Sequence, residues 1–151
     1  MSGPNPTRLL IESGRLVDRL SQATDALISD LGLTAARWQV LGVVAQAATP
    51  ATVSHIARIM GLARQSVQRV VNDLIREGMV KAQRNPHHAR APLIVLTAKG
   101  QAAYEAASQR RDPWARGLTA EIDETELKTA LKVIKALNRA LVSSASEASQ
   151  A

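Results

Sequence analysis

The side chains between Arg64 and Arg76 have the chemistry needed to contact DNA bases. Arginine can donate two hydrogen bonds to guanine, and glutamine or asparagine can both donate to and accept from adenine. Residues of these types recur every three or four positions, so a helix would place them on one face. That face would carry Gln65, Gln68, Arg69, Asn72 and Arg76, with Arg64 and Ser66 in the opening turn. We predict base contacts from Arg64, Gln65, Gln68 and Arg69, and a phosphate contact from Ser66.

Two helices and a tight turn would position this surface. Val53, Ile56 and Met60 recur at helical spacing just upstream of it. Thr52 can cap the start of that first helix, and Gly61 can adopt the left-handed conformation that ends it. The second helix has its own apolar stripe, formed by Val67, Val70, Val71 and Leu74. Two short helices with a glycine in the turn are typical of a helix-turn-helix.

A β-hairpin is expected directly after the second helix. Residues 80–84 and 92–96 read as strands, and residues 85–90 form a polar turn between them. A helix-turn-helix followed by such a hairpin is a winged helix. Lys81 and Arg84 would contact phosphates there, because a cation attracts the backbone of any sequence. The alternative interpretation is a helical hairpin and a β-hairpin that merely pack together.

The positive charge of the chain is concentrated in the same region. Residues 52–92 contain seven basic and two acidic side chains, a balance of +5 in a chain whose net charge is +6. His55, His87 and His88, the three histidines of the chain, also lie there. A positive patch confined to one module indicates a polyanionic partner. The alternative is an ordinary solvated basic surface.

Composition excludes several classes of function. A length of 151 residues suits one domain with a real core. The absence of cysteine excludes disulfides, thiol redox sensing and cysteine-ligated zinc. Without phenylalanine, and with two tryptophans and one tyrosine, the chain lacks platforms for stacking on single strands. No apolar run approaches the ~20 residues of a membrane span, and no signal-peptide region opens the chain, so we expect a cytoplasmic protein without a membrane partner.

Enzymatic activity is not expected. The eight glycines are scattered and form no phosphate-cradling loop. His87 and His88 are adjacent, so together with His55 they are poorly spaced for zinc. No serine belongs to a recognisable group with a histidine and an acid. We therefore expect no catalytic residue, no metal site and no cofactor.

Long apolar stripes near both ends of the chain indicate a homodimer. Residues 7–31 and residues 98–142 are expected to be helical. The small winged helix between them, which we call the reading module, cannot bury all their apolar side chains. Interleaving of these helices between two subunits would bury them, whereas a monomer would need a self-contained bundle. A symmetric dimer would place two reading helices in successive major grooves, about 10 base pairs apart, on a pseudo-palindromic operator. The stripes are Leu9, Leu16, Leu20, Leu27 and Leu31, then Leu127, Leu131, Ile134, Leu137 and Leu141.

Between the first stripe and the reading module, Thr34 should cap a helix over residues 35–47, and residues 49–51 should be a linker. Several segments in this order resemble the MarR family of transcriptional regulators over about residues 7–141. The matching segments are LTAARWQVL (33–41), VSHIA (53–57), RQSVQRVV (64–71), LIREGMV (74–80) and LTAKG (96–100). The resemblance implies an obligate dimer that usually represses transcription, and in many members a small aromatic or phenolic ligand relieves that repression.

The resemblance also suggests roles for residues outside the reading helix. The wing of this family commonly carries Asp-x-Arg, with the arginine entering the minor groove. Here the corresponding residues are His88, Ala89 and Arg90, so the arginine is retained and the carboxylate is not. A ligand between the dimer helices and the reading lobe could contact Trp38, and Arg15 could pair with its carboxylate or phenolate. Trp38 as plain core and Arg15 as a surface arginine are the alternatives.

These observations predict a mainly α fold with a small β-hairpin wing, as a single MarR-like domain over residues 1–151. Residues 34–97 would form the winged helix-turn-helix lobe, and residues 7–31 and 98–142 the interleaved dimerisation helices. The predicted function is sequence-specific binding of double-stranded DNA to regulate transcription, as the dimeric repressor that the family resemblance implies. The alternative function is a winged-helix protein-interaction module that has lost specific DNA reading, which Ala63 and Ala89 favour.

Overall fold

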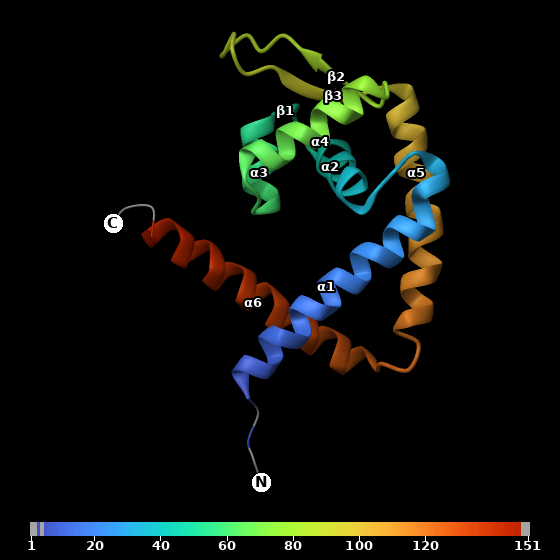
Figure 1. Cartoon of the computed structure of the whole chain (residues 1–151), viewed down its shortest axis with the longest axis vertical. Helices are drawn as coiled ribbons and strands as arrows, with labels where there is room; N and C mark the ends of the chain where they lie inside the picture. The colour runs from blue at the N-terminus through green and yellow to red at the C-terminus, as the bar shows by residue number, and fades with distance from the viewer. Residues whose placement is uncertain (1–2, 4, 149–151) are drawn as a thin grey trace. The chain divides into compact units, whose positions relative to one another are not determined.

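The computed structural model describes residue 3 and residues 5–148, and the described chain is mainly helical with a small antiparallel sheet (Figure 1). It divides into two compact units, with the boundary between Arg111 and Asp112. The first unit contains a helix-turn-helix followed by a β-hairpin, so the predicted winged-helix fold is confirmed. Within the described residues, no helix combines the length and apolar character that crossing a membrane requires.

The first unit opens with a long helix that buries only its C-terminal end. Helix α1 spans Pro6–Ile28, a 3-10 turn follows over Ser29–Leu31, and α2 spans Ala35–Gln46. Thr34 caps α2 as predicted, because its hydroxyl accepts a hydrogen bond from the Arg37 amide at 3.2 Å. Thr24 and Ile28 are the buried residues of α1, while large apolar side chains nearer its start are exposed. These exposed side chains are Leu9, Leu10, Ile11, Leu16 and Val17.

The helix-turn-helix consists of α3, which spans Val53–Met60, and α4, which spans Arg64–Arg76. The Thr52 hydroxyl accepts from the His55 amide at 3.3 Å and so caps α3. Gly61 ends this helix with φ +64°, the left-handed conformation that its missing side chain permits. The apolar faces of α2, α3 and α4 form one core, whose fully buried members include Val40, Leu41, Ile56, Val67, Val71 and Leu74.

The sheet has one strand more than the sequence predicts. Strands β1 (Ala51–Thr52), β2 (Val80–Gln83) and β3 (Leu93–Leu96) form an antiparallel sheet in the order β1-β3-β2. Ala51 therefore pairs with Ile94 instead of belonging to a linker, and that part of the prediction is wrong. A strand of two residues is too short to produce an alternating pattern, so the sequence gives no sign of it. The hairpin of β2 and β3 is confirmed.

Helix α5 (Ala98–Leu118) begins against the turn that follows α4. The Thr97 hydroxyl donates to the Gly78 carbonyl at 2.6 Å and accepts from the Gly100 amide at 3.1 Å. The Lys99 ammonium donates to the Glu77 carbonyl at 2.6 Å. A methyl group on Gly100 would lie 1.8 Å from the Met79 carbonyl oxygen, so only glycine allows this approach. The turn that ends α4 is thus held directly by the start of α5.

The second unit, from Asp112 onward, contains the end of α5 and helix α6 (Glu124–Ala148). The start of α6 has the reciprocal cap that the sequence suggests. The Asp123 carboxylate accepts from the Glu126 amide at 2.8 Å, and the Glu126 carboxylate accepts from the Asp123 amide at 3.1 Å. Helix α6 continues beyond residue 142, the predicted end of the dimerisation helices, and its large apolar side chains are exposed. They include Leu127, Leu131, Ile134 and Leu141.

Candidate nucleic-acid interface

The predicted base-reading side chains lie together on α4. Arg64, Gln65, Ser66 and Arg69 are exposed, and Gln68 is half-buried. The opposite side of the helix is anchored by Val67, Val71 and Leu74, which have 1%, 0% and 0% of their surfaces exposed. This division follows from the period of 3.6 residues, since the buried positions fix the rotation of the helix about its axis. The polar face must therefore point away from the core.

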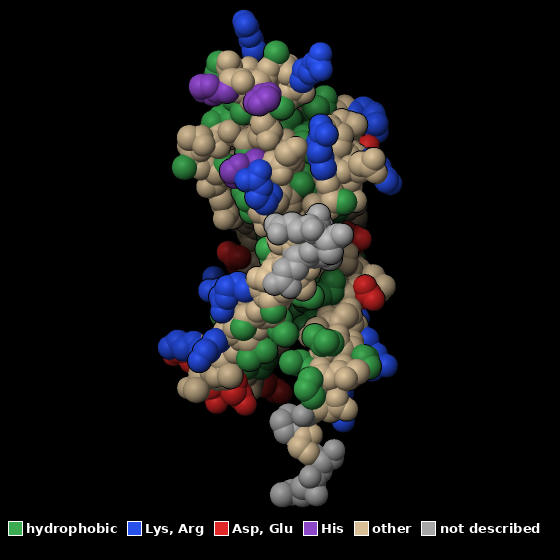
Figure 2. Space-filling view, turned by 90° about the vertical axis from the view of Figure 1, so that its left-hand side faces the viewer, with side chains coloured by type: hydrophobic (Ala, Val, Ile, Leu, Met, Phe, Trp, Pro, Cys, Tyr) green, Lys and Arg blue, Asp and Glu red, His purple; other side chains and the backbone are tan. Residues whose placement is uncertain are grey.

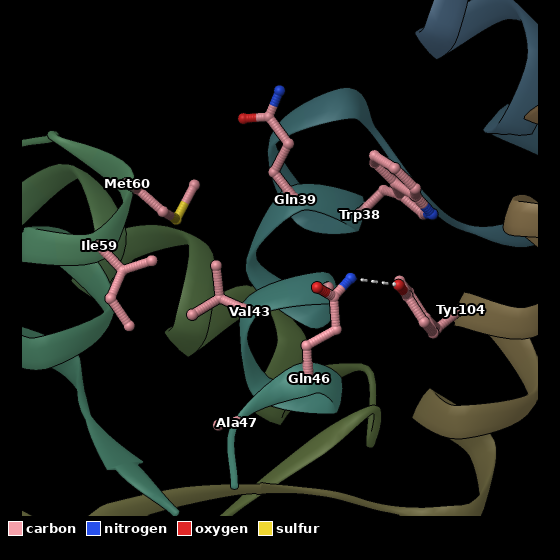
Figure 3. Close-up of a pocket in the computed structure, with 9 residues that line it drawn as sticks. Trp38, Gln39, Val43, Gln46, Ala47, Ile59, Met60 and Tyr104 are labelled. Atoms are coloured by element: carbon pink, nitrogen blue, oxygen red, sulfur yellow. Dashed lines mark hydrogen bonds between the residues drawn. The ribbon is translucent and has the colours of Figure 1, made fainter. Parts of the chain in front are cut away.

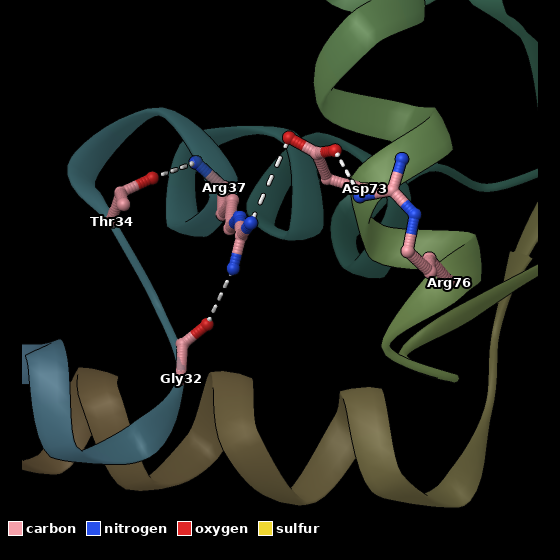
Figure 4. Close-up of polar contacts among 5 residues, drawn as sticks. All are labelled: Gly32, Thr34, Arg37, Asp73 and Arg76. Atoms are coloured by element: carbon pink, nitrogen blue, oxygen red, sulfur yellow. Dashed lines mark hydrogen bonds and ion pairs between the residues drawn. The ribbon is translucent and has the colours of Figure 1, made fainter.

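Two polar pairs on α4 involve residues of this face. The Gln68 side-chain amide donates to the Asn72 carbonyl oxygen at 2.9 Å. One turn further along, the Arg76 guanidinium pairs with Asp73 at 2.9 Å. Asp73 also lies 3.7 Å from the guanidinium of Arg37 on α2, as Figure 4 shows. Arg37 donates in addition to the Gly32 carbonyl at 3.1 Å, so it links the start of α2 to the reading helix.

The remaining predicted contacts lie on the wing. Lys81 belongs to β2, Arg84 follows it, and His88 and Arg90 lie in the segment that joins β2 to β3. All four side chains are exposed. Among the described residues, the side chains of His88 and Arg90 have no hydrogen-bond or ion-pair partner within the chain, which leaves them available to an external one.

The shape of the wing tip depends on Asn85, whose role the sequence does not predict. Its side-chain carbonyl accepts from the His87 amide at 3.0 Å, and its side-chain amide donates to the Ala91 carbonyl at 2.9 Å. Its backbone carbonyl accepts from the His88 amide at 3.3 Å. Asparagine before proline is a known signal for such a side-chain-stabilised turn, so the pair at positions 85 and 86 could have identified it.

Basic and histidine side chains gather over this lobe in space. Figure 2 shows Lys, Arg and His side chains across the visible face of its upper part, where the wing and the helix-turn-helix lie. Acidic residues are few in the corresponding segment of the chain, as the charge balance indicates. Such a surface attracts a polyanion over distances comparable to the Debye length, about 8 Å at physiological salt.

A pocket of about 480 Å³ opens beside α2 in the same unit (Figure 3). Its volume is within the range of small-molecule sites, about 300–1,000 Å³. Trp38 stacks on Tyr104 of α5 with the ring centroids 6.1 Å apart, and the Gln46 side chain donates to the Tyr104 hydroxyl at 3.1 Å. The guanidinium of Arg111 lies 4.2 Å from the centre of the Trp38 ring. The lining residues are Trp38, Gln39, Gly42, Val43, Gln46, Ala47, Ile59, Met60 and Tyr104.

The two predicted ligand-binding residues have different surroundings. Trp38 lines the pocket, and its indole N–H is buried with no hydrogen-bond partner among the described residues. Arg15 is on α1, where it pairs with Glu12 at 2.9 Å and its side chain remains 61% exposed. Arg15 is not one of the lining residues of the pocket. The structure therefore does not bring Arg15 and Trp38 together within one chain.

One bidentate ion pair joins α5 to the turn after α1. The Arg110 guanidinium donates to the two carboxylate oxygens of Asp30 at 2.5 and 2.9 Å and to the Leu27 carbonyl at 3.1 Å. The hydrogen bond from Arg110 is the main cause that lowers the pKa of the Asp30 carboxyl below its ordinary value. Within the described residues, no group of three His, Asp or Glu side chains could hold a metal ion.

Sequence comparison finds relatives over much of the chain. A sequence profile described as "MarR family" matches residues 31–91. Uncharacterized proteins of Mycobacterium tuberculosis and Mycobacterium bovis are each 39% identical over 103 residues, which cover 68% of this chain and 71% of theirs.

Solved structures extend the match to nearly the whole fold. A MarR/EmrR family transcriptional regulator from Acinetobacter sp. ADP1 is similar with a TM-score of 0.81 and 24% identity, covering 93% of this chain and 99% of that one. A mutant MarR from E. coli complexed with operator DNA has a TM-score of 0.72 and 25% identity, covering 89% and 99%. The transcriptional regulator MOSR from M. tuberculosis, in complex with DNA, has a TM-score of 0.72 and 26% identity, covering 87% and 96%. Together with the winged helix and its exposed polar α4, these matches identify the chain as a member of the MarR family of transcriptional regulators.

Proposed function

We propose that this regulator is a homodimeric repressor that binds a pseudo-palindromic operator and is released from it by a small-molecule ligand. The observation that carries the proposal is the exposed polar face of α4 beside a basic wing on one lobe. Base-edge contacts confer specificity and phosphate contacts confer affinity, and this lobe offers residues for both. The operator structures of the E. coli and M. tuberculosis relatives support DNA as the partner.

Each residue of the surface has a role in this proposal. Arg64, Gln65, Gln68 and Arg69 read base edges in the major groove, where each good pair contributes about 1–3 kcal/mol of discrimination. Ser66, Lys81 and Arg84 contact phosphates, so they add affinity for any sequence. Arg90 enters the minor groove at the wing tip, with His88 beside the phosphates. The His88 imidazole offers Arg90 at most one acceptor nitrogen, whereas a carboxylate would offer two oxygens.

Dimerisation accounts for the apolar side chains that each unit leaves exposed. On α1 these include Leu16 and Val17, with 52% and 64% of their surfaces exposed, and on α6 they include Ile134 and Leu141, with 50% and 64%. Burial of such side chains contributes about 25 cal/mol for each Å² removed from water. A second copy of the chain is the partner that explains both helices, and it doubles the number of reading helices on the operator.

Ligand release would act through the pocket beside α2. Its apolar lining and the stacked rings of Trp38 and Tyr104 suit a small aromatic or phenolic molecule. The Gln46 amide and the Tyr104 hydroxyl use only part of their hydrogen-bonding capacity on each other. The remaining capacity could orient that molecule. Arg15, which lies outside this pocket, would contribute only if a second subunit completes the site.

The test is an anisotropy titration of a labelled duplex from the region upstream of the protein's own gene. A scrambled duplex serves as the control, and both are measured at low and near-physiological salt. The proposal expects tight binding that prefers the native duplex and persists as salt rises. Equal, salt-sensitive binding to both duplexes would instead support the protein-interaction alternative, provided that a duplex selected from a random library shows no preference either.

A further inference from the structure

The hydrogen bond between Gln68 and Asn72 leaves a defined set of atoms free at the centre of the reading helix. Gln68 is half-buried and Asn72, one turn later, is exposed. The Gln68 Nε2 atom donates to the Asn72 Oδ1 atom at 2.9 Å. A side-chain amide nitrogen carries two hydrogens, so one N–H and the carbonyl oxygen of Gln68 remain unused by this contact.

The unused atoms of Gln68 match one base better than the others. Adenine presents an N7 acceptor next to an N6 amino donor in the major groove. A glutamine that contacts both must offer its carbonyl oxygen and an N–H of the same amide side by side. In this structure Asn72 engages the amide through the Gln68 nitrogen. If both amides turned over together, Asn72 would donate to the Gln68 carbonyl oxygen instead, and the contact would still restrain the Gln68 side chain.

We propose that Asn72 is a positioning residue that holds the Gln68 amide where its free carbonyl oxygen and N–H can read adenine. This inference rests on the proposed function, because it requires that α4 contacts base edges. Asn72 acts through its Oδ1 atom and does not itself need to touch DNA. Pre-ordering of this kind raises specificity because the amide need not be immobilised when the complex forms.

A second interpretation gives Asn72 its own base contact, and the two can be separated by substitution. Asn72→Asp keeps an oxygen that can accept from Gln68 but removes both side-chain donors. If Asn72 only positions Gln68, the aspartate variant retains the base preference while it weakens binding to all sequences through its negative charge. If Asn72 donates to a base, the aspartate variant loses that preference. Asn72→Ala removes the acceptor and the donors together.

The experiment begins with the wild-type protein and a random duplex library, from which the preferred half-site is selected. Dissociation constants are then measured by anisotropy on duplexes that carry each single base-pair change. Gln68→Ala identifies the base pair that Gln68 reads, and the inference expects an adenine there. Asn72→Ala should reduce the preference at that same base pair by about 2- to 12-fold, the range expected for one hydrogen bond, and leave the other positions unchanged.

A double-substitution cycle and a control variant complete the design. In the Gln68→Ala background, Asn72→Ala should cause no further loss of preference, because the residue through which it acts is gone. Gln101→Ala breaks a comparable pair on α5, where Gln101 donates to Glu105 at 2.6 Å, and should leave the preferences intact. Thermal melts establish that each variant is folded.

The outcomes separate this inference from the proposed function. If the wild-type protein selects no preferred sequence, both fail, and no variant is needed to show it. If the wild type is specific but Asn72→Ala keeps the preference at the Gln68 position, or alters a different position, only the inference fails. Loss of the preference in Asn72→Asp, or additive losses in the double variant, would also overturn it, since Asn72 would then read a base itself.

Discussion

At the scale of single residues, Gly100 has the most restrictive surroundings of the glycines in the chain. A methyl group at this position would lie 1.8 Å from the Met79 carbonyl oxygen and 2.8 Å from its carbon, and both belong to backbone that cannot rotate away. The helix start must therefore shift if any side chain is added. Such overpacking typically costs about 1–3 kcal/mol of stability.

We therefore expect Gly100→Ala to lower the free energy of unfolding by about 1–3 kcal/mol, measured by denaturant titration. Gly117→Ala is the matched control in the same helix, since nothing lies within 4 Å of a methyl group there. Alanine is favoured over glycine inside helices by about 0.5–1 kcal/mol, so the control should be neutral or stabilising. Equal effects of the two substitutions would contradict the close approach at Gly100.

The Asp30–Arg110 pair makes a pH-dependent contribution to stability. The pKa of Asp30 is lowered in the folded protein, chiefly by its hydrogen bond from Arg110. The unfolded chain therefore binds a proton at higher pH than the folded chain does. The contribution is complete above the ordinary pKa of aspartate and is lost as pH falls through the lowered folded value.

The variant Asp30→Asn should reveal this contribution. We expect the unfolding free energies of wild type and variant to differ at neutral pH and to converge as pH falls below about 4. The pair is exposed, so the difference should be small and should shrink further at high salt. A difference that stays constant from neutral to acidic pH would assign the effect to packing instead of charge.

At the scale of elements, Asn85 links the two ends of the wing tip. Its side chain bonds to the backbone of both His87 and Ala91, so it holds the segment that carries His88 and Arg90. We expect Asn85→Ala to weaken DNA binding by roughly 2- to 12-fold per hydrogen bond lost, without changing the base preferences of α4. Anisotropy titrations on the selected duplex and its single-base variants would measure both quantities. A changed base preference would show that the wing tip also sets the position of α4.

The helices of the reading lobe could be predicted because their information is local. Val67, Val71 and Leu74 repeat at helical spacing, and Thr34, Thr52 and Gly61 mark helix ends through bonds to residues three or four positions away. The third strand could not be predicted, because Ala51 becomes part of a strand only through Ile94, far along the chain. The approach of Gly100 to Met79 likewise depends on tertiary packing that no periodicity encodes.

In the candidate site, too, local features could be predicted from the sequence and tertiary contacts could not. The residue types that read bases could be found from the sequence, because their spacing places them on one helix face. Their hydrogen bonds to one another could not be predicted, because a flexible side chain such as Gln68 has several polar neighbours within reach on the helix. The pocket residues come from α2 and its C-cap, from α3 and from α5, and of these the sequence suggests only Trp38 as a ligand contact. Tyr104 lies 66 positions away and has no local signal.

At the scale of the whole molecule, the exposed apolar residues lead to a prediction about mass. We expect size-exclusion chromatography coupled to light scattering to give the wild-type protein twice the 16.2 kDa mass of the chain. Ile134→Asp on α6 should shift the population toward monomer, because it places a charge on the apolar face. Lys135→Glu, on the neighbouring exposed position, is the control for a charge change alone. A wild-type mass of 16.2 kDa would contradict the dimer.

The anchoring of the turn after α4 by the start of α5 has a mechanical consequence. Tyr104, which lines the pocket, and Gly100, which touches the Met79 carbonyl, are four residues apart on α5. Residues at that spacing lie on consecutive turns of one helix, about 6 Å apart along its axis. Helix α5 therefore connects the pocket wall to the turn that follows the reading helix through one continuous helical segment. A molecule that shifts the backbone of α5 at Tyr104 would press on the Met79 carbonyl through Gly100.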